Sequence, residues 1–218
     1  IVVTDLSDER IARARQLIPE SLAAAQGIRL VYINPGECSD EFTELMELTG
    51  GQGYDDIFVY TAIRSLAEMG DRLLGRDGCM NFFSGPTDKS FSASINLYNC
   101  HYASTHVIGT TGGTTEDLKE AFRLAAQGKI RPAVMVTHVG GLDSIAETTR
   151  NLPHIPGGKK LTYTQFNMPL TAIADFREKG RTDPLFARLA DCCDAHGGLW
   201  NSEAENILFR HFHVPTFS

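Results

Sequence analysis

The apolar positions of this chain follow two alternating rhythms over its first 130 residues. Short apolar runs rich in β-branched side chains predict strands, and apolar residues at helical spacing between those runs predict helices. The predicted strands are 1–5, 28–33, 56–60, 79–83 and 106–108, and the predicted helices cover 7–25, 39–48, 62–74 and a stretch that begins near Thr114. This alternation of strands and helices predicts a doubly wound α/β fold, in which helices cover both faces of a parallel sheet.

Three local signals indicate where helices begin. Ser7 precedes an acidic pair, so its hydroxyl and the two carboxylates favour a helix N-terminus at that point. Pro19 either kinks this helix or begins a second one. Thr114 and Asp117 have the spacing of a capping box, which predicts the start of the helix that follows the fifth strand.

The rhythm changes after residue 128, and we expect a boundary near Arg131. The expected elements are a strand at 133–136, a helix at 143–149 and a loop rich in Pro and Gly at 151–160. From about residue 167 to 218 the pattern predicts a helical appendage, with a helix that starts at Asp183-Pro184.

Composition and charge exclude several classes of protein. The 218 residues are 42% apolar and 22% charged, which argues against disorder. No apolar run approaches the roughly 18 residues of a membrane span, and no secretory leader is visible, so we expect a cytoplasmic protein with no membrane partner. The formal charge of −7 provides no electrostatic footprint for nucleic acid. Five cysteines without a framework spacing predict free thiols.

Asp5 is the first candidate for chemistry because it ends a predicted strand. An acid at the carboxyl end of a parallel strand accepts the ribose hydroxyls of a nucleotide, but an acid just before a helix also serves as a helix cap. Both interpretations remain open from position alone. The glycine-rich turn that normally lies about 20 residues upstream of such an acid is not seen, so the sequence is expected to lack its natural beginning.

The other candidates each have an ordinary interpretation beside the functional one. Thr61 and Ser84-Gly85 follow predicted strands, where α/β proteins bind ligands, but each also suits a simple turn. Gly109 to Gly113 leads into a helix N-terminus, which favours anions, or is a flexible loop. Lys159-Lys160 is either a solvated pair or neutralises a pyrophosphate. The vicinal thiols Cys192 and Cys193 point to different sides of a helix, which disfavours joint metal ligation.

Several motifs together resemble the zinc-type, medium-chain alcohol and polyol dehydrogenases. The motifs are Val3-Thr4-Asp5 with Arg10, Gly109-Thr110-Thr111 before Glu116-Asp117-Leu118, Ala125-Ala126-Gln127-Gly128-Lys129-Ile130, and Thr137-His138 before a short helix. The similarity runs from the second strand of that family's nucleotide domain to about Phe166. It implies an incomplete Rossmann-type sheet over 1–131, a returning segment of the catalytic domain over 132–166, and a C-terminal helical extension over 167–218.

The resemblance also implies a function and a set of site residues. The implied activity is hydride transfer between NAD, or NADP, and a polyol or sugar phosphate of the L-sorbose 1-phosphate/D-glucitol 6-phosphate type, in a homo-oligomer. The residues implied to bind the coenzyme are Asp5, Arg10, Thr61, Ser84, Gly85, Ile108, Gly109, and Lys159 or Lys160. An acid at position 5 favours NAD over NADP, because a 2′-phosphate would meet like charge.

The family's zinc is implied to be held by residues outside this chain, and neither a catalytic residue nor a metal ligand is assigned within it. We therefore expect the chain alone to be inactive. Two other functions stay open: a non-catalytic nucleotide-binding module and a protein-interaction domain.

The resemblance makes one prediction about the sheet. In the family's strand order 3-2-1-4-5-6 the first strand is central, so its absence would leave a slot of about 9.6 Å between its neighbours. We expect these neighbours to pair directly, to borrow a strand from another chain, or to receive one from residues upstream. A complete sheet in the family order built from residues 1–218 alone would refute the alignment.

Overall fold

The structure is a computed structural model that describes residues 1–215. It divides into two compact units, which we describe separately: unit 1 is Ile1–Leu118 and unit 2 begins at Lys119. The boundary falls within helix α6 (Thr115–Ala126), whose N-terminus has the predicted capping box. The Thr114 N–H and hydroxyl both donate to Asp117 Oδ2, at 2.7 and 2.8 Å, and the Asp117 N–H donates back to the Thr114 hydroxyl.

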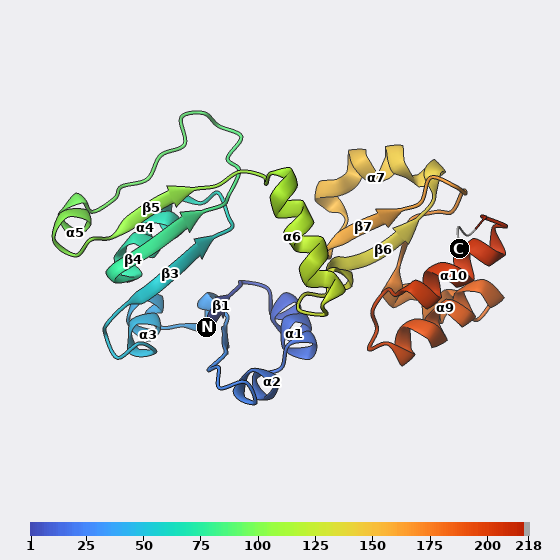
Figure 1. The fold of residues 1–218 in the computed structure, drawn as a ribbon, viewed down its shortest axis with the longest axis horizontal. Coiled ribbons are helices and arrows are strands. Elements are labelled where there is room, and N and C mark those ends of the chain that lie inside the picture. The colour runs from blue at the N-terminus through green and yellow to red at the C-terminus, as the bar shows by residue number, and fades with distance from the viewer. Residues whose placement is uncertain (216–218) are drawn as a thin grey trace. The chain divides into compact units, whose positions relative to one another are not determined.

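The strands of unit 1 form two separate parallel sheets (Figure 1). One sheet pairs β1 (Val2–Thr4) with β2 (Val31–Ile33), and the other has the order β3 (Tyr54–Val59), β4 (Leu74–Phe82), β5 (His106–Gly109). No ladder joins β1 to β3 within residues 1–215, which excludes direct pairing, the first of the three alternatives. Each of them therefore ends its sheet with an unpaired edge.

The helices of unit 1 begin where the local sequence signals place them. They are α1 (Asp8–Leu17), α2 (Glu20–Ala24), α3 (Glu41–Glu47), α4 (Arg64–Leu73) and α5 (Leu97–Tyr102). The Ser7 hydroxyl accepts the Arg10 N–H at 3.3 Å and caps α1, and Pro19 precedes a second helix rather than a kink. Helix α5 was not predicted; the Asn96 side chain caps it by accepting the Tyr98 N–H at 3.0 Å.

Helix α4 lies unusually close to strand β4 at Gly70. A Cβ atom on Gly70 would lie 2.7 Å from the Met80 sulfur, which is shorter than any normal contact. Met80 is 1% exposed and therefore fills the space that a side chain at position 70 would need. The glycine allows the helix and the sheet to bury this methionine between them.

Unit 2 contains a mixed three-stranded sheet. Its order is β7 (Lys159–Thr162), β6 (Val136–Gly140), β8 (Thr171–Ala172), with β6 parallel to β7 and antiparallel to β8. The strand predicted at 133–136 is wrong, because Pro132 begins a 3₁₀ helix and the strand starts only at Val136. The loop predicted at 151–160 also ends early, since Lys159 and Lys160 already belong to β7.

Helices complete unit 2. They are α7 (Ile145–Asn151), α8 (Phe176–Lys179), α9 (Pro184–Ala195) and α10 (Ser202–His211). Asp183 caps α9 by accepting the Leu185 N–H at 2.8 Å, as its place before Pro184 predicts. The predicted α/β class with a C-terminal helical appendage is confirmed.

The core of unit 2 is one continuous cluster that joins the sheet to the helical appendage. Its buried members are Val139, Tyr163, Phe166, Met168, Phe176, Leu185, Leu189, Ala190, Cys192, Cys193, Trp200, Ala204 and Leu208. Inside it the Trp200 indole N–H donates to the Tyr163 hydroxyl at 3.0 Å.

Over the described part of the chain, no helix is both long enough and apolar enough to cross a bilayer.

Candidate functional site

Asp5 and Arg10 form a tight pair at the carboxyl end of β1. The Asp5 backbone N–H continues the ladder by donating to Ile33 O at 3.2 Å, so the carboxylate lies where the strand ends and the turn to α1 begins. Arg10 donates through Nε to Asp5 Oδ2 at 2.8 Å and through Nη2 to Asp5 Oδ1 at 2.7 Å. The Ser7 N–H donates to the same Oδ1 at 2.8 Å. Asp5 is not the helix cap, because Ser7 fills that position.

The hydrogen bonds fix the charge of Asp5. The bond from Arg10 lowers the pKa of the Asp5 carboxyl, partial burial opposes that shift, and the Ser7 N–H lowers the pKa further. A carboxylate offers about four lone-pair sites. Three are occupied here, so one site on Oδ2 remains for another donor while Arg10 stays in place. The Asp5 side chain is 30% exposed, so an external donor has access to it.

A second group of predicted residues lies at the carboxyl ends of β3, β4 and β5. Thr61, Ser84-Gly85 and Ile108-Gly109 end or follow these three hydrogen-bonded strands, and Phe82 is paired with both Val59 and Gly109. Because the strands are parallel, their carboxyl ends share one edge of the sheet. The structure thus brings these strand ends together at one edge of the sheet.

Asn81 and Thr110 add a polar pair to the same edge. The Thr110 hydroxyl donates to Asn81 Oδ1 at 2.7 Å, which links the end of strand β4 to the loop after β5. Sequence reasoning missed Asn81, although an amide within an otherwise apolar strand is a signal that could have been used. Beside it lies a cavity of about 310 Å³, and its lining includes Ile108 and Gly109 together with Phe82 and Phe91.

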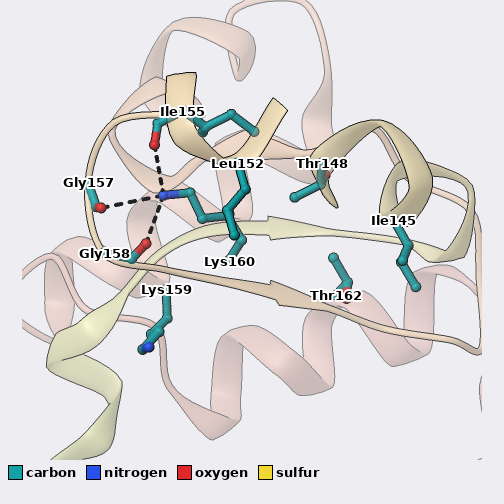
Figure 2. A pocket seen from close by; sticks show the side chains of 9 residues that line it. All are labelled: Ile145, Thr148, Leu152, Ile155, Gly157, Gly158, Lys159, Lys160 and Thr162. Atoms are coloured by element: carbon teal, nitrogen blue, oxygen red, sulfur yellow. Dashed lines mark hydrogen bonds between the residues drawn. The ribbon is translucent and has the colours of Figure 1, made fainter. Parts of the chain in front are cut away.

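The two predicted lysines belong to unit 2 and behave differently. The Lys160 ammonium donates to the carbonyls of residues 155, 156, 157 and 158 at 3.1, 2.9, 3.4 and 2.8 Å, and Figure 2 shows the side chain reaching into this loop. Burial lowers the pKa of Lys160. An ammonium has three N–H groups, so these carbonyls use all of its donors. Lys159, the neighbouring residue, is exposed.

A cavity of about 410 Å³ lies next to these lysines (Figure 2). Its lining comes from α7, the loop before β7, and β7 itself: Ile145, Thr148, Leu152, Ile155, Gly157, Gly158, Lys159, Lys160 and Thr162. The hydroxyls of Thr148 and Thr162, the exposed Lys159 and an apolar wall give it the character of a site for a polar or anionic small molecule.

The residues at these edges do not form a metal centre. Within residues 1–215, the one group of three side chains with suitable ligand atoms close together includes none of these strand-end residues. The strand-end set consists of one carboxylate, one guanidinium, hydroxyls and backbone groups, and a zinc ion prefers Cys and His beside carboxylates. Zinc therefore does not fit this set, whereas a ligand rich in hydroxyl groups does.

Comparison with known proteins connects this arrangement to a family. Residues 1–127 match the model of the zinc-binding dehydrogenases. The chain is 55% identical to the uncharacterized protein YggP of Escherichia coli, 49% to mannitol-1-phosphate 5-dehydrogenase of Aliivibrio fischeri and 41% to L-sorbose 1-phosphate reductase of Klebsiella pneumoniae. The alignments cover 97–98% of this chain and 50%, 51% and 48% of those proteins. The chain thus spans about half the length of the curated relatives it matches.

A solved structure supports the fold. Benzyl alcohol dehydrogenase from Acinetobacter calcoaceticus matches with a TM-score of 0.57 at 18% identity, over 74% of this chain and 42% of that one. At this identity the likeness concerns the fold alone. It agrees with the parallel sheets of unit 1 and with the predicted α/β class.

Proposed function

Because this chain belongs to the zinc-binding dehydrogenase family, we propose that it contributes the coenzyme-binding region of a nicotinamide-dependent oxidoreductase. The reaction proposed for the whole protein is hydride transfer between NAD, or NADP, and a hydroxyl or carbonyl carbon of a sugar phosphate or polyol. Two relatives that match along nearly all of this chain have names that specify sugar-phosphate substrates, which supports that substrate class. An L-sorbose 1-phosphate/D-glucitol 6-phosphate type of substrate is our choice within the class.

The observation that carries the proposal is the Asp5 carboxylate at the end of a parallel strand. Its remaining lone-pair site on Oδ2 suits one ribose hydroxyl, and release of one Arg10 bond would free a second site for the neighbouring hydroxyl. Arg10 thus keeps the carboxylate ionised and oriented before the coenzyme binds. An ionised acceptor gives a stronger hydrogen bond than a neutral one.

The remaining assignments follow the same strand ends. We propose that Thr61, Ser84-Gly85 and Ile108-Gly109 line the nicotinamide side of the site, largely through backbone groups. Of the two lysines, Lys159 is the better pyrophosphate contact, because the Lys160 N–H groups already donate to four carbonyls. The coenzyme supplies the hydride chemistry when bound, and the protein residues position it.

Three further features belong to the proposal. The family's zinc is proposed to be held by residues outside this chain. Residues 1–131, 132–166 and 167–218 are proposed as a partial dinucleotide-binding domain, a returning catalytic segment and a helical extension. The whole protein is proposed to be a cytoplasmic homo-oligomer.

Calorimetric titration of the full-length protein with NAD tests the role of Asp5. Asp5→Asn keeps the size of the side chain but removes its charge, so we expect NAD to bind about 10-fold to 100-fold more weakly, as for a lost charged hydrogen bond of about 1.5–3 kcal/mol. Glu9→Gln is the matched control, because Glu9 is an exposed acid on the adjacent helix α1, and this variant should bind NAD like the parent.

NADP provides the second arm of the test. The negative charge of Asp5 should weaken binding of a 2′-phosphate, so Asp5→Asn should narrow or reverse the preference for NAD over NADP. Unchanged affinity for both coenzymes in Asp5→Asn would overturn the assignment. A protein that binds neither coenzyme but forms a stable complex with another protein would instead support the interaction domain.

A further inference from the structure

Three potential metal ligands converge where α9 ends and α10 begins. They are the Cys192 thiol, the His196 imidazole and the Glu203 carboxylate, and their ligand atoms all lie within 4.8 Å of one another. Cys192 is buried, whereas His196 and Glu203 are exposed. The sulfur is therefore held by the surrounding core, whereas the imidazole and the carboxylate lie at the surface and can rotate.

The local fold explains why these residues meet. Cys192 and His196 are four residues apart, so they lie on the same face of α9 and its C-cap. Gly197 and Gly198 follow with φ angles of +68° and +77°, a left-handed turn that reverses the chain. Asn201 then caps α10 by accepting the Glu203 N–H at 3.0 Å, which places Glu203 in the first turn of α10 and next to the end of α9.

The hydrogen bonds of His196 prepare it for ligation. Its Nδ1 lies 2.8 Å from the Cys192 carbonyl oxygen, which accepts only, so Nδ1 carries the proton. The lone pair of the neutral ring is then on Nε2, which faces Glu203 Oε2 at 3.9 Å. A ligating histidine in proteins commonly donates its second N–H to a backbone carbonyl in this way.

The remaining contacts of the set are weak. The distance of 3.9 Å between His196 Nε2 and Glu203 Oε2 is too long for a hydrogen bond. The Cys192 thiol donates a weak hydrogen bond to Asn201 Oδ1 at 3.4 Å. A dication between the three ligand atoms would hold them together more strongly than these contacts do.

We propose that Cys192, His196 and Glu203 bind one divalent transition-metal ion of the zinc class, with water as a fourth ligand. Sulfur, imidazole nitrogen and carboxylate oxygen together suit zinc or cobalt and do not suit magnesium or calcium, which prefer oxygen alone. Tetrahedral ligands at about 2.0–2.3 Å from zinc are about 3.3–3.8 Å apart. To bind the ion, the ligand atoms must therefore approach one another by about 1 Å, which rotation of the exposed His196 and Glu203 side chains allows.

Such an ion would crosslink the end of α9 to the start of α10 across the turn formed by Gly197 and Gly198. It would act by stabilising the fold, because a site closed by protein ligands adds its binding free energy to folding. The same helices carry the buried residues Leu189 and Leu208 of the unit 2 core. The expected benefit is thus a more rigid helical appendage.

Cobalt substitution tests the proposal directly. The full-length protein is freed of metal with a chelator and titrated with Co²⁺, and thiolate-to-cobalt charge-transfer absorption is recorded together with the bound metal per chain. All comparisons are differences between the parent and a variant, so any metal bound elsewhere cancels. We expect the parent to bind one more ion than Cys192→Ser and to show an additional thiolate band.

Two ligand variants and a control sharpen this test. His196→Gln and Glu203→Gln should each weaken cobalt binding. The loss of an outer-shell partner weakens metal binding by about 10-fold to 100-fold, and the loss of a direct ligand should weaken it by at least as much. His154→Gln is the matched control, because His154 is an exposed histidine of the same unit that is not in the ligand group, and it should bind like the parent. Trp200 fluorescence confirms that each variant is folded.

A second measurement does not depend on absorbance. Hydrogen exchange should slow over residues 192–203 when Zn²⁺ is added to the parent, and it should not slow in Cys192→Ser. Equal metal content and equal cobalt spectra in the parent and Cys192→Ser would overturn the proposal. So would exchange at 192–203 that Zn²⁺ leaves unchanged in the parent.

Discussion

The two units differ in how they use their apolar side chains. Unit 2 buries Phe176, Trp200 and Leu208 in one continuous cluster, and its aromatic rings contact one another at centroid distances of 4.3 to 6.4 Å. In unit 1 the apolar residues of the strands often remain exposed: Phe58 is 57% exposed and Tyr60 is 70% exposed. Phe58 stacks on Tyr60, and the Phe83 ring packs edge-on against Tyr60 at a centroid distance of 5.9 Å, yet Phe83 is itself 48% exposed.

The difference shows that forming elements and burying them are separate steps. Unit 1 has regular strands and capped helices, yet its strands are divided between two sheets, so β1 and β3 both present open edges and part of their apolar surface. Unit 2 has a smaller sheet, but Val139 of β6 lies in the same buried cluster as Leu189 of α9 and Leu208 of α10. Burial, rather than regularity of secondary structure, should therefore determine which unit is the more stable.

The largest expected effect is on the unit 2 core. Phe176 is 1% exposed, so Phe176→Ala should reduce the free energy of unfolding of unit 2 by about 3–5 kcal/mol, because it leaves a cavity. Phe58→Ala in unit 1 should change stability by less than about 0.5 kcal/mol, since that ring is already largely exposed. Urea unfolding followed through Trp200, the only tryptophan, reports on unit 2. Equal losses in the two variants would contradict the comparison.

Lys160 gives the next largest effect. Lys160→Met removes the donor for four loop carbonyls, and we expect unit 2 to lose about 1–2 kcal/mol, near the lower end for an unsatisfied buried group. Lys159→Met is the matched control and should leave stability unchanged within about 0.5 kcal/mol. The affinity for NAD should fall in Lys159→Met and change less in Lys160→Met. A loss of stability in Lys159→Met instead would reverse the roles assigned to the two lysines.

The smallest effect concerns pH and Cys193. Burial, with smaller contributions from Cys192 and Asp194, raises the pKa of the Cys193 thiol from 9.0 to about 12. Since the folded pKa is above the unfolded one, its contribution to stability is complete below pH 9 and is lost as pH rises toward 12. The urea midpoint of unit 2 should fall over this range, and less steeply in Cys193→Ala. Equal slopes in both proteins would show that another group dominates.

Local sequence signals predicted much of unit 1. Ser7, Pro19 and the Thr114 capping box act within a few residues, so their effects are visible without the tertiary structure. The place of Asp5 at the end of a strand is visible for the same reason, because the strand before it is a short β-branched run. Its pairing with Arg10 is less visible in the sequence. The two residues are five positions apart, and the first turn of α1 brings their side chains together.

The features that sequence reasoning missed depend on contacts between distant segments. Asn81 and Thr110 are 29 residues apart, and only the pairing of β4 with β5 brings them together. Cys192 and His196 have the i, i+4 spacing of one helix face, but two possible ligands alone do not define a metal site. Glu203 joins them only because two glycines turn the chain.

The contact between Gly70 and the Met80 sulfur has a consequence for how this protein can vary. One small volume between α4 and β4 is shared by two positions, so the volume can hold a side chain from one of them but not from both. Gly70→Ala alone should be poorly tolerated, whereas the same change combined with a shorter residue at position 80 should be accepted. Homologues with a larger residue at the first position should therefore carry a smaller one at the second.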